Sequence, residues 1–250
     1  MSRKDINKEA AIKWCAKLYD DEAWRSVTDA SIKNTKVFVG KTLQHTGRTH
    51  ARIICSPDTS TKCAEDYVKK GAKSICILNF ASYFNPGGDF LKGSISQEES
   101  LCHVSNLYNI LSGLEVYKTR RQSQDLTGLY GDDIIFSPDV KFISDDGTEY
   151  YADVISASAP NCNRKDFTAK ERDLSIENRI ETILAIADKM EYDVIILGAW
   201  GCGVMNNNPK KVAKAFRHFF RKYDISVNDI VFAIPNSKLL SVFGDELIRM

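Results

Sequence analysis

The sequence predicts one α/β domain in which helices cover both faces of a mixed β-sheet. Short β-rich runs alternate with helical stretches along most of the chain, which is the pattern of a three-layer αβα sandwich. Several β-rich runs, such as SICILNF and DVIILGAW, are continuously apolar, as strands buried on both faces tend to be. A length of 250 residues is sufficient for one such domain with a substantial core.

The N-terminal stretch is predicted to be helical. Apolar residues spaced among charges, including Ile6, Trp14 and Leu18, predict an amphipathic helix over residues 5–19. We therefore expect residues 1–35 to form an N-terminal helical extension and residues 36–250 to form the sandwich.

The remaining elements follow from apolar periodicity and from turn residues. The expected strands are 36–39, 52–55, 74–79, 134–137, 140–143, 153–158, 193–198 and 230–234. The expected helices are 61–70, 97–111, 172–190, 209–223 and 238–248. Asp146-Gly147 favours a tight turn, which indicates hairpin structure within residues 134–155. Ser96 followed by Glu99 matches a capping box, and Asn208-Pro209 offers an N-cap with proline at the first helical position.

Composition narrows the classes of function. The net charge of +1 argues against a general surface for nucleic acid or for anionic membranes, and no apolar run approaches the roughly 20 residues of a membrane-spanning helix. The charged N-terminal stretch lacks the apolar core of a signal peptide. Seven cysteines, odd in number and without CxxC spacing, are typical of a reducing compartment. We expect a cytoplasmic monomer.

The most informative motif lies in residues 79–102. Gly87 and Gly88 form a turn after a predicted strand, and Glu98 and Glu99 follow where a helix should begin. Glycines let a backbone approach a bulky anion, because no Cβ stands in the way, and a carboxyl group held nearby can transfer a proton to what that anion carries. Taken alone, the same residues also fit an ordinary strand–turn–helix junction whose glutamates complement the helix dipole.

A second glycine loop follows another buried strand, in residues 197–216. Gly198, Gly201 and Gly203 have a GxxGxG spacing, which is neither a Walker A loop nor the dinucleotide fingerprint. Backbone N–H groups of such a loop can wrap a pair of phosphates, although glycines also serve simply for tight turning. Two glycine loops at the ends of buried strands favour a shared site, since ligands of α/β folds bind at strand ends.

Other reactive residues give weaker signals. The four histidines have no metal-ligand spacing, so we expect no metal site. Proton transfer by a carboxyl group, the chemistry suggested above, requires no cofactor. Cys202 lies between two glycines without an evident base partner, so we expect its backbone to matter more than its thiol.

With these residues in view, the chain resembles the microbial-type poly(ADP-ribose) glycohydrolase family, a branch of the macrodomain fold. The family signature is three glycines, six to eight residues and then QEE. Here it reads GGD at 87–89, seven residues, and QEE at 97–99. The resemblance continues through SLCHVSNLY, DDIIFSPDVKFI, DVISASAPN and LGAWGCGV, and it covers roughly residues 50–235 in order.

This resemblance implies a macrodomain-like sandwich that binds ADP-ribose in a cleft at the strand ends and hydrolyses O-glycosidic ribose–ribose bonds in poly(ADP-ribose). Glu99 would match the family's catalytic glutamate, which protonates the leaving oxygen and then accepts a proton from the attacking water. Glu98 would orient the ribose, and Gln97 would help to set it in place. The other substrate-binding residues that the resemblance implies are Asn79, Asn85, Pro86, Gly87, Gly88, Asp89, Ala199, Gly201, Cys202, Gly203, Val204 and Met205.

Two positions depart from the family pattern. Asp89 replaces the third glycine, and its charge would repel a diphosphate if the side chain pointed inward. Met205 stands where the family more often has an aromatic residue that packs on the terminal ribose. Two alternatives therefore stay open. One is hydrolysis of another ADP-ribose linkage, on a protein, a nucleic acid or a small nucleotide. The other is a module that binds ADP-ribose without cutting it, against which retention of QEE argues.

Overall fold

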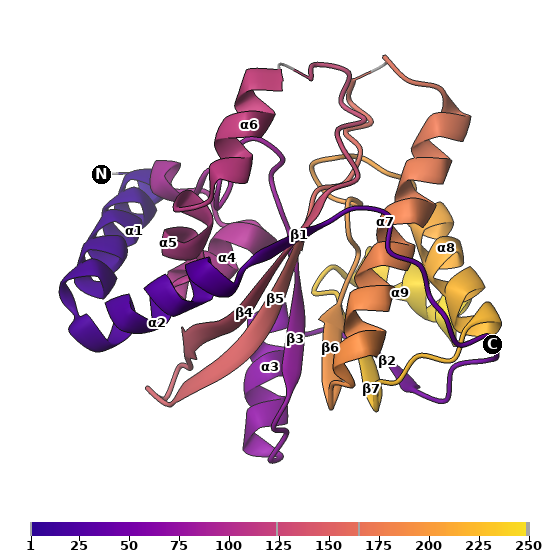
Figure 1. Ribbon diagram of the computed structural model, residues 1–250, viewed down its shortest axis with the longest axis horizontal. Coiled ribbons are helices and arrows are strands. Elements are labelled where there is room, and N and C mark those ends of the chain that lie inside the picture. Colours follow the sequence, from indigo (N-terminus) through magenta and orange to yellow (C-terminus); the bar gives the residue numbers. More distant parts are fainter. Residues whose placement is uncertain (1, 124, 165, 249–250) are drawn as a thin grey trace.

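The computed structural model describes residues 2–123, 125–164 and 166–248. Within them, a seven-stranded sheet runs through the centre of the protein (Figure 1). Its strands are β1 (Lys36–Phe38), β2 (Arg52–Ser56), β3 (Ile75–Phe80), β4 (Ile134–Ile143), β5 (Glu149–Ala157), β6 (Val194–Leu197) and β7 (Asp229–Ala233). They are ordered β1-β4-β5-β3-β6-β7-β2. All neighbouring pairs are parallel except those of β4, which is antiparallel to both β1 and β5. The predicted mixed sheet is confirmed.

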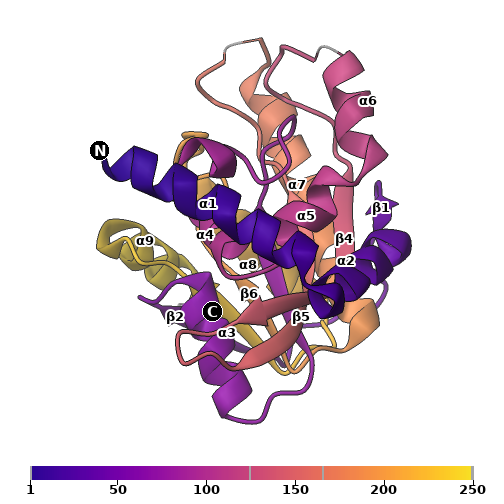
Figure 2. The ribbon, with the colours of Figure 1, turned by 90° about the vertical axis from the view of Figure 1, so that its left-hand side faces the viewer.

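Helices cover both faces of this sheet (Figures 1 and 2). One layer contains α1 (Arg3–Asp20), α2 (Glu22–Asn34), α3 (Ser60–Lys69), the 3-10 helix η1 (Phe90–Lys92), α4 (Gln97–His103), α5 (Leu107–Ser112) and α6 (Glu115–Ser123). The other layer contains α7 (Ala169–Met190), α8 (Pro209–Lys222) and α9 (Ser237–Leu247).

Alternate residues of the central strands enter two separate cores. In β3, Ile75 and Ile77 pack in the core beneath α1 to α6, whereas Cys76 and Leu78 pack in the core beneath α7 to α9. Since both faces are covered, each of these four side chains is at most 3% exposed. This double coverage explains the continuous apolar runs in the sequence, and the three-layer sandwich is confirmed.

The prediction of one helix over residues 97–111 is wrong, because two helices, α4 and α5, occupy this stretch. Between them the backbone leaves the helix and pairs with β4: Ile143 N–H donates to the Val104 carbonyl at 2.8 Å, and Asn106 N–H donates to the Lys141 carbonyl at 3.2 Å. Leu107 N–H then donates to the Ser105 hydroxyl at 3.1 Å. Pairing with the sheet thus overrides the local helical pattern.

The predicted strands 134–137 and 140–143 form one strand, β4, with an irregularity between Ser137 and Val140. Asp139 at this point has a positive φ of 53°. The strand pairs with β5 in the predicted hairpin, and Gly147 in its turn has a φ of 84°.

The predicted N-terminal helix is confirmed as α1, which packs behind the segment that follows the glycine turn. Its predicted apolar face is only partly buried, because Leu18 is buried whereas Ile6 is 52% exposed. Asn7 Nδ2 donates to the Gly93 carbonyl at 3.4 Å, and Trp14 Nε1 donates to the Ser105 carbonyl at 2.9 Å. A Cβ on Gly93, whose φ is 84°, would lie 2.2 Å from the Lys4 carbonyl oxygen. The division into an extension of residues 1–35 and a sandwich of residues 36–250 stays a proposal.

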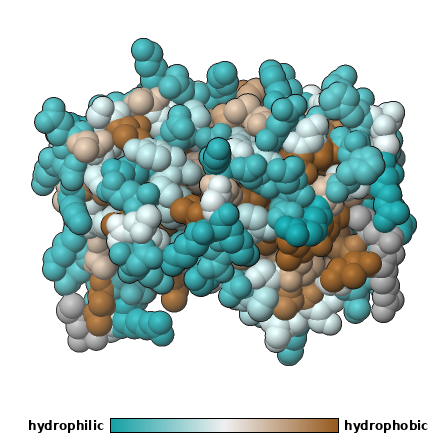
Figure 3. All heavy atoms as spheres, turned by 90° about the horizontal axis from the view of Figure 1, so that it is seen from below, coloured by the Kyte–Doolittle hydropathy of each residue, from teal (hydrophilic) through white to brown (hydrophobic). Residues whose placement is uncertain are grey.

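Hydrophilic residues cover most of the face that Figure 3 shows, and the hydrophobic ones gather mainly towards its right-hand side. Within the described residues, no helix combines the length and apolar character that crossing a membrane requires.

Candidate active site

A cleft of about 680 Å³ lies where three parallel strands end. One wall is formed by the segment that follows β3 and by the start of α4, and the opposite wall by the loop that follows β6. The segment after β7 closes one end. The cleft thus brings the two glycine loops together. The predicted site residues that line it are Asn85, Gly88, Asp89, Gln97, Glu98, Glu99, Ala199, Gly201, Gly203, Val204 and Met205.

Glu98 is held at the first turn of α4 by groups that donate hydrogen bonds. Asn79 Nδ2 donates to its Oε1 at 3.2 Å, and Ser82 N–H donates to its Oε2 at 2.8 Å. The residue is 4% exposed. Burial raises the pKa of Glu98 to about 8, although the hydrogen bonds from Ser82 and Asn79 favour the charged form. At neutral pH and without a ligand, this carboxyl group therefore keeps its proton.

Glu99 is equally buried but has different partners. Asp89 N–H donates to its Oε1 at 2.9 Å, and the Ser96 hydroxyl donates to its Oε2. Ser96 therefore makes no capping hydrogen bond, although its backbone has the extended conformation of an N-cap. The predicted capping box is wrong, because the Glu99 side chain turns towards the glycine turn instead of back towards the Ser96 N–H.

The glycine turn is shaped by the protein's own carboxyl groups. Gly87 and Gly88 have φ angles of 67° and 63°, which few residues other than glycine adopt. A Cβ on Gly88 would lie 2.5 Å from Glu99 Oε1 and 3.0 Å from Glu98 Oε2. A Cβ on Gly87 would lie 2.7 Å from the Tyr108 ring. The absence of a side chain at position 88 is thus required to seat both glutamates.

Asp89, the residue that replaces the third glycine of the signature, fits this turn without strain. Its φ is −102°, which any residue can adopt. Its carboxylate forms an ion pair with Lys92 Nζ at 2.8 Å, and its side chain is 48% exposed. Its negative charge is therefore partly offset by a neighbouring cation, and its N–H is the donor to Glu99.

The opposite wall uses its glycines differently. A Cβ added to Gly198 would lie 2.7 Å from the Ala233 carbonyl oxygen, and a Cβ added to Gly201 would lie 2.6 Å from the Ala159 Cβ. Both glycines therefore permit close packing inside the protein. Gly203 has nothing within 4 Å of the same position. Of these three glycines, Gly203 alone has free space around its Cβ position, and it lines the cleft.

Residues 202, 204 and 205 flank Gly203. Burial raises the pKa of the Cys202 thiol to about 12, which disfavours the thiolate that a nucleophilic role requires, and its Sγ contacts the Trp200 carbonyl at 3.4 Å. Cys202 is not among the residues that line the cleft. Val204 is 80% exposed, and Met205 is half-buried.

Gln97 and Asn79 frame the carboxyl pair. The Gln97 amide accepts from Phe80 N–H at 2.9 Å and donates to the Leu78 carbonyl at 2.8 Å, so it fixes the end of β3 to α4. Asn79 is fully buried behind Glu98 and does not line the cleft. Pro86 and Gly87 do not line it either. A contact of Gln97 with the ribose stays a prediction.

One part of the cleft was missed by the sequence reasoning. It is lined by Thr59, Ser60 and Thr61 at the start of α3 and by Ile234, Pro235, Asn236 and Leu239 around the start of α9. The signal was present, because the apolar run IVFAIP ends in this segment and strand ends are where α/β folds bind ligands. It was not used because the segment contains no glycine.

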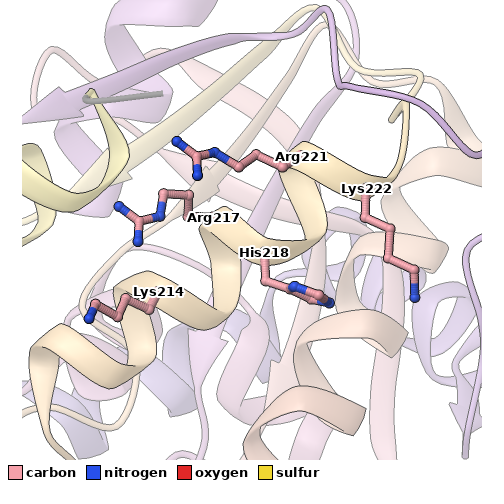
Figure 4. A pocket seen from close by; sticks show the side chains of 5 residues that line it. All are labelled: Lys214, Arg217, His218, Arg221 and Lys222. Carbon is pink, nitrogen blue, oxygen red and sulfur yellow. The ribbon is translucent and has the colours of Figure 1, made fainter.

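A second depression, of about 380 Å³, lies on α8 and is lined by basic side chains (Figure 4). Arg217 Nη1 pairs with Glu246 Oε2 at 2.9 Å, and Lys222 Nζ lies 4.9 Å from the Tyr223 ring centre. Among the residues that the structure describes, no carboxyl group and none of the predicted site residues lines this depression, so it is not the candidate active site. Within the described ranges, no three His, Cys, Asp or Glu side chains are grouped to hold a metal ion.

Comparisons with known proteins agree with this geometry. Residues 17–145, about half of the chain, match the family model described as microbial-type PARG, catalytic domain. The poly(ADP-ribose) glycohydrolase from Thermomonospora curvata, bound to the inhibitor ADP-HPD, is 24% identical; the match covers 96% of this chain and 99% of that one, with a TM-score of 0.82. The enzyme from Deinococcus radiodurans in complex with ADP-ribose is 29% identical over 89% of this chain and 98% of that one, with a TM-score of 0.78. Curated protein sequences gave no match.

Proposed function

Because the chain belongs to the family of microbial-type poly(ADP-ribose) glycohydrolase catalytic domains, we propose that it hydrolyses the O-glycosidic ribose–ribose bonds of poly(ADP-ribose) and releases ADP-ribose. The observation that carries this proposal is the pair of buried carboxyl groups in a cleft that also presents the apolar side chains of Ile234, Pro235 and Leu239. Glycosidases likewise place carboxyl groups at the scissile bond.

The two ends of ADP-ribose differ in chemistry, and each suits a different part of the cleft, which gives the proposed direction of binding. Its adenine would lie against Ile234, Pro235 and Leu239, which are apolar, and its terminal ribose would lie near the glutamates. The diphosphate would then cross the backbone at Gly203, whose Cβ position has free space around it. The Deinococcus radiodurans relative, which is similar over most of this chain, has been solved with ADP-ribose, and this supports the same ligand here.

In the reaction, Glu99 in its protonated form would donate its proton to the glycosidic oxygen as the bond to the anomeric carbon breaks. That carbon acquires positive charge, which the nearby diphosphate of the substrate can stabilise. The Glu99 carboxylate would next accept a proton from the attacking water, so one residue serves as acid and then as base.

Glu98 would orient the ribose. Its neutral carboxyl group carries a proton up to about pH 8 in the empty protein, so it can donate a hydrogen bond to a sugar hydroxyl as well as accept one. The hydrogen bonds from Asn79 and Ser82 fix the position of this carboxyl group.

A substitution of Glu99 tests the proposal. We expect Glu99→Gln to reduce the release of ADP-ribose from poly(ADP-ribose) by about 10²–10⁴-fold, because glutamine cannot transfer the proton. Calorimetry should show ADP-ribose binding within a few-fold of wild type, since the amide keeps the shape of the carboxyl group. Glu177→Gln, at an exposed carboxyl on α7, is the matched control and should retain full activity.

Other outcomes separate the alternatives. Unchanged turnover in Glu99→Gln would remove this residue from the mechanism. A wild-type protein that ignores the polymer but cleaves mono-ADP-ribosylated protein, nucleic acid or a small nucleotide would assign it to another linkage. Tight ADP-ribose binding without hydrolysis of any conjugate would make it a binding module.

The cellular setting is also part of the proposal. All seven cysteines are free thiols. This supports a reducing compartment and hence the cytoplasm. We propose that the protein acts there as a monomer, which size-exclusion chromatography with light scattering would check.

A further inference from the structure

Ser96 differs from the other hydroxyl residues that precede helices in this protein. Ser2 before α1 and Thr168 before α7 both complete capping boxes, in which the side chain accepts from the backbone N–H three residues on. Ser96 has the same sequence pattern and an extended backbone, yet makes no such bond. The hydroxyl forgoes the stabilisation of a helix cap. It does donate to Glu99, just as the hydroxyls of Ser2 and Thr168 donate to the carboxylate three residues on, so the missing cap bond is what distinguishes Ser96.

The two oxygens of Glu99 therefore have partners of different chemistry. Oε1 accepts from the Asp89 N–H at 2.9 Å and lies beside Gly88. A backbone N–H can only donate, so an acidic proton on Oε1 would oppose it. Oε2 faces a hydroxyl, which can both donate and accept. When the Glu99 carboxyl group is neutral, its proton is therefore favoured on Oε2 over Oε1.

We propose that Ser96 is a positioning residue that places the transferable proton on Oε2 of Glu99. This inference rests on the proposed function, in which Glu99 is the acid. While Glu99 is neutral and no polymer is bound, the Ser96 oxygen accepts a hydrogen bond from Oε2 and so keeps the proton on that oxygen until the glycosidic oxygen takes the place of Ser96 as its acceptor. When that proton passes to the glycosidic oxygen and the bond to the anomeric carbon breaks, the Ser96 hydroxyl turns to donate to the carboxylate that remains. Ser96 itself neither gains nor loses a proton.

The location of Ser96 agrees with this role. It lines the cleft together with Glu99, whereas Gly88 and the Asp89 N–H enclose the Oε1 side. The segment that carries Asp89 and Ser96 is braced from behind by α1 through Asn7 and the Gly93 carbonyl. The position of the hydroxyl is therefore set by the fold as well as by its own rotamer.

The experiment compares Ser96→Ala with Thr168→Ala, which removes a true helix cap far along the chain from the carboxyl pair. For Ser96→Ala we expect kcat for release of ADP-ribose from polymer to fall at least tenfold, with KM within twofold of wild type and an unchanged urea midpoint. For Thr168→Ala we expect a lower urea midpoint and an unchanged kcat. Ser96→Thr, which keeps a hydroxyl, should recover most of kcat.

A spectroscopic measurement tests the inference without turnover. In protein labelled with ¹³C at glutamate carboxyl groups, the Glu99 signal is identified by its loss in Glu99→Gln. Its titration with pH should shift between wild type and Ser96→Ala, and should return in Ser96→Thr.

The results separate the inference from the proposed function. If Glu99→Gln is inactive while Ser96→Ala has wild-type kcat and an unaltered Glu99 titration, the role of Ser96 is refuted and the function stands. A loss of stability in Ser96→Ala without loss of kcat would make the hydroxyl a mere cap. If wild type hydrolyses no ADP-ribose conjugate, the function fails, and the carboxyl titration still decides whether Ser96 controls Glu99.

Discussion

The two walls of the cleft contain similar glycine loops but use them in opposite ways. On the wall after β3, the Glu98 and Glu99 carboxyl groups lie against Gly88, and all four of their oxygens accept hydrogen bonds from protein donors. On the wall after β6, the Cβ position of Gly203 has free space around it, and the neighbouring Val204 is 80% exposed. We propose that the first wall is preorganised for chemistry and that the second contacts the ligand.

This difference shows that the role of a glycine-rich loop cannot be inferred from its sequence motif alone. The sequence suggested that glycines at both loops let the backbone approach a phosphate. In the structure, Gly88 makes room for carboxyl groups of the protein, and Gly201 makes room for Ala159. Gly203 has no protein atom within 4 Å of its Cβ position, and contact of its backbone with an anion stays a prediction.

The sharpest way to break this comparison is to add one methyl group to each wall. Gly88→Ala should lower kcat about 10²-fold or more, because its Cβ would displace both carboxyl groups and its φ of 63° is strained for alanine. Gly203→Ala should change KM only a few-fold and leave kcat near wild type, because its Cβ meets no protein atom within 4 Å. Steady-state kinetics on polymer of defined length measures both, and equal losses in the two variants would contradict the division of roles.

The raised pKa of Glu98 predicts how stability depends on pH. The folded protein keeps this proton up to about pH 8, whereas the unfolded chain releases it near its ordinary value of 4.5, so the free energy of unfolding should fall as pH rises through this window. The contribution is at most about 1.4 kcal/mol per pH unit. Glu98→Gln cannot titrate, so its free energy of unfolding should fall less steeply between pH 5 and 8.

Urea unfolding of the two proteins at several pH values measures this difference. Asp153, whose pKa is also raised by burial, is present in both proteins and cancels in the comparison. Parallel curves for wild type and Glu98→Gln would show that Glu98 is ionised in the folded protein, and its assigned role as a neutral hydrogen-bond donor would be lost.

The smallest expected effect concerns Met205 on the wall after β6. Met205→Phe restores the aromatic residue that the family more often has, and a flat ring should hold the terminal ribose more firmly than a flexible thioether. We expect KM for polymer to fall about two- to fivefold with kcat unchanged. A large change in kcat instead would indicate that this wall also takes part in the chemistry.

Much of the fold was predictable because the signals were local. The continuous apolar runs identified the buried strands, and Asn208-Pro209 correctly placed the start of α8, where Asn208 accepts from Lys211 N–H at 3.1 Å. The position of Glu98 and Glu99 at a helix start was also evident from sequence. These features depend on neighbours within a few residues.

Features that depend on distant residues could not be predicted in this way. The break between α4 and α5 arises from pairing with β4, which is more than thirty residues away. The capping box at Ser96 failed because Asp89 N–H, seven residues earlier, captures Glu99. One part of the cleft is lined by the starts of α3 and α9, which no local pattern connects.

The most direct measurement is a crystal structure of Glu99→Gln with ADP-ribose bound. We expect the anomeric hydroxyl to lie within hydrogen-bond reach of residue 99, about 3 Å away, with the diphosphate along Gly203 and the adenine against Leu239. A ligand in the reverse direction, or one whose ribose lies away from residue 99, would contradict this expectation.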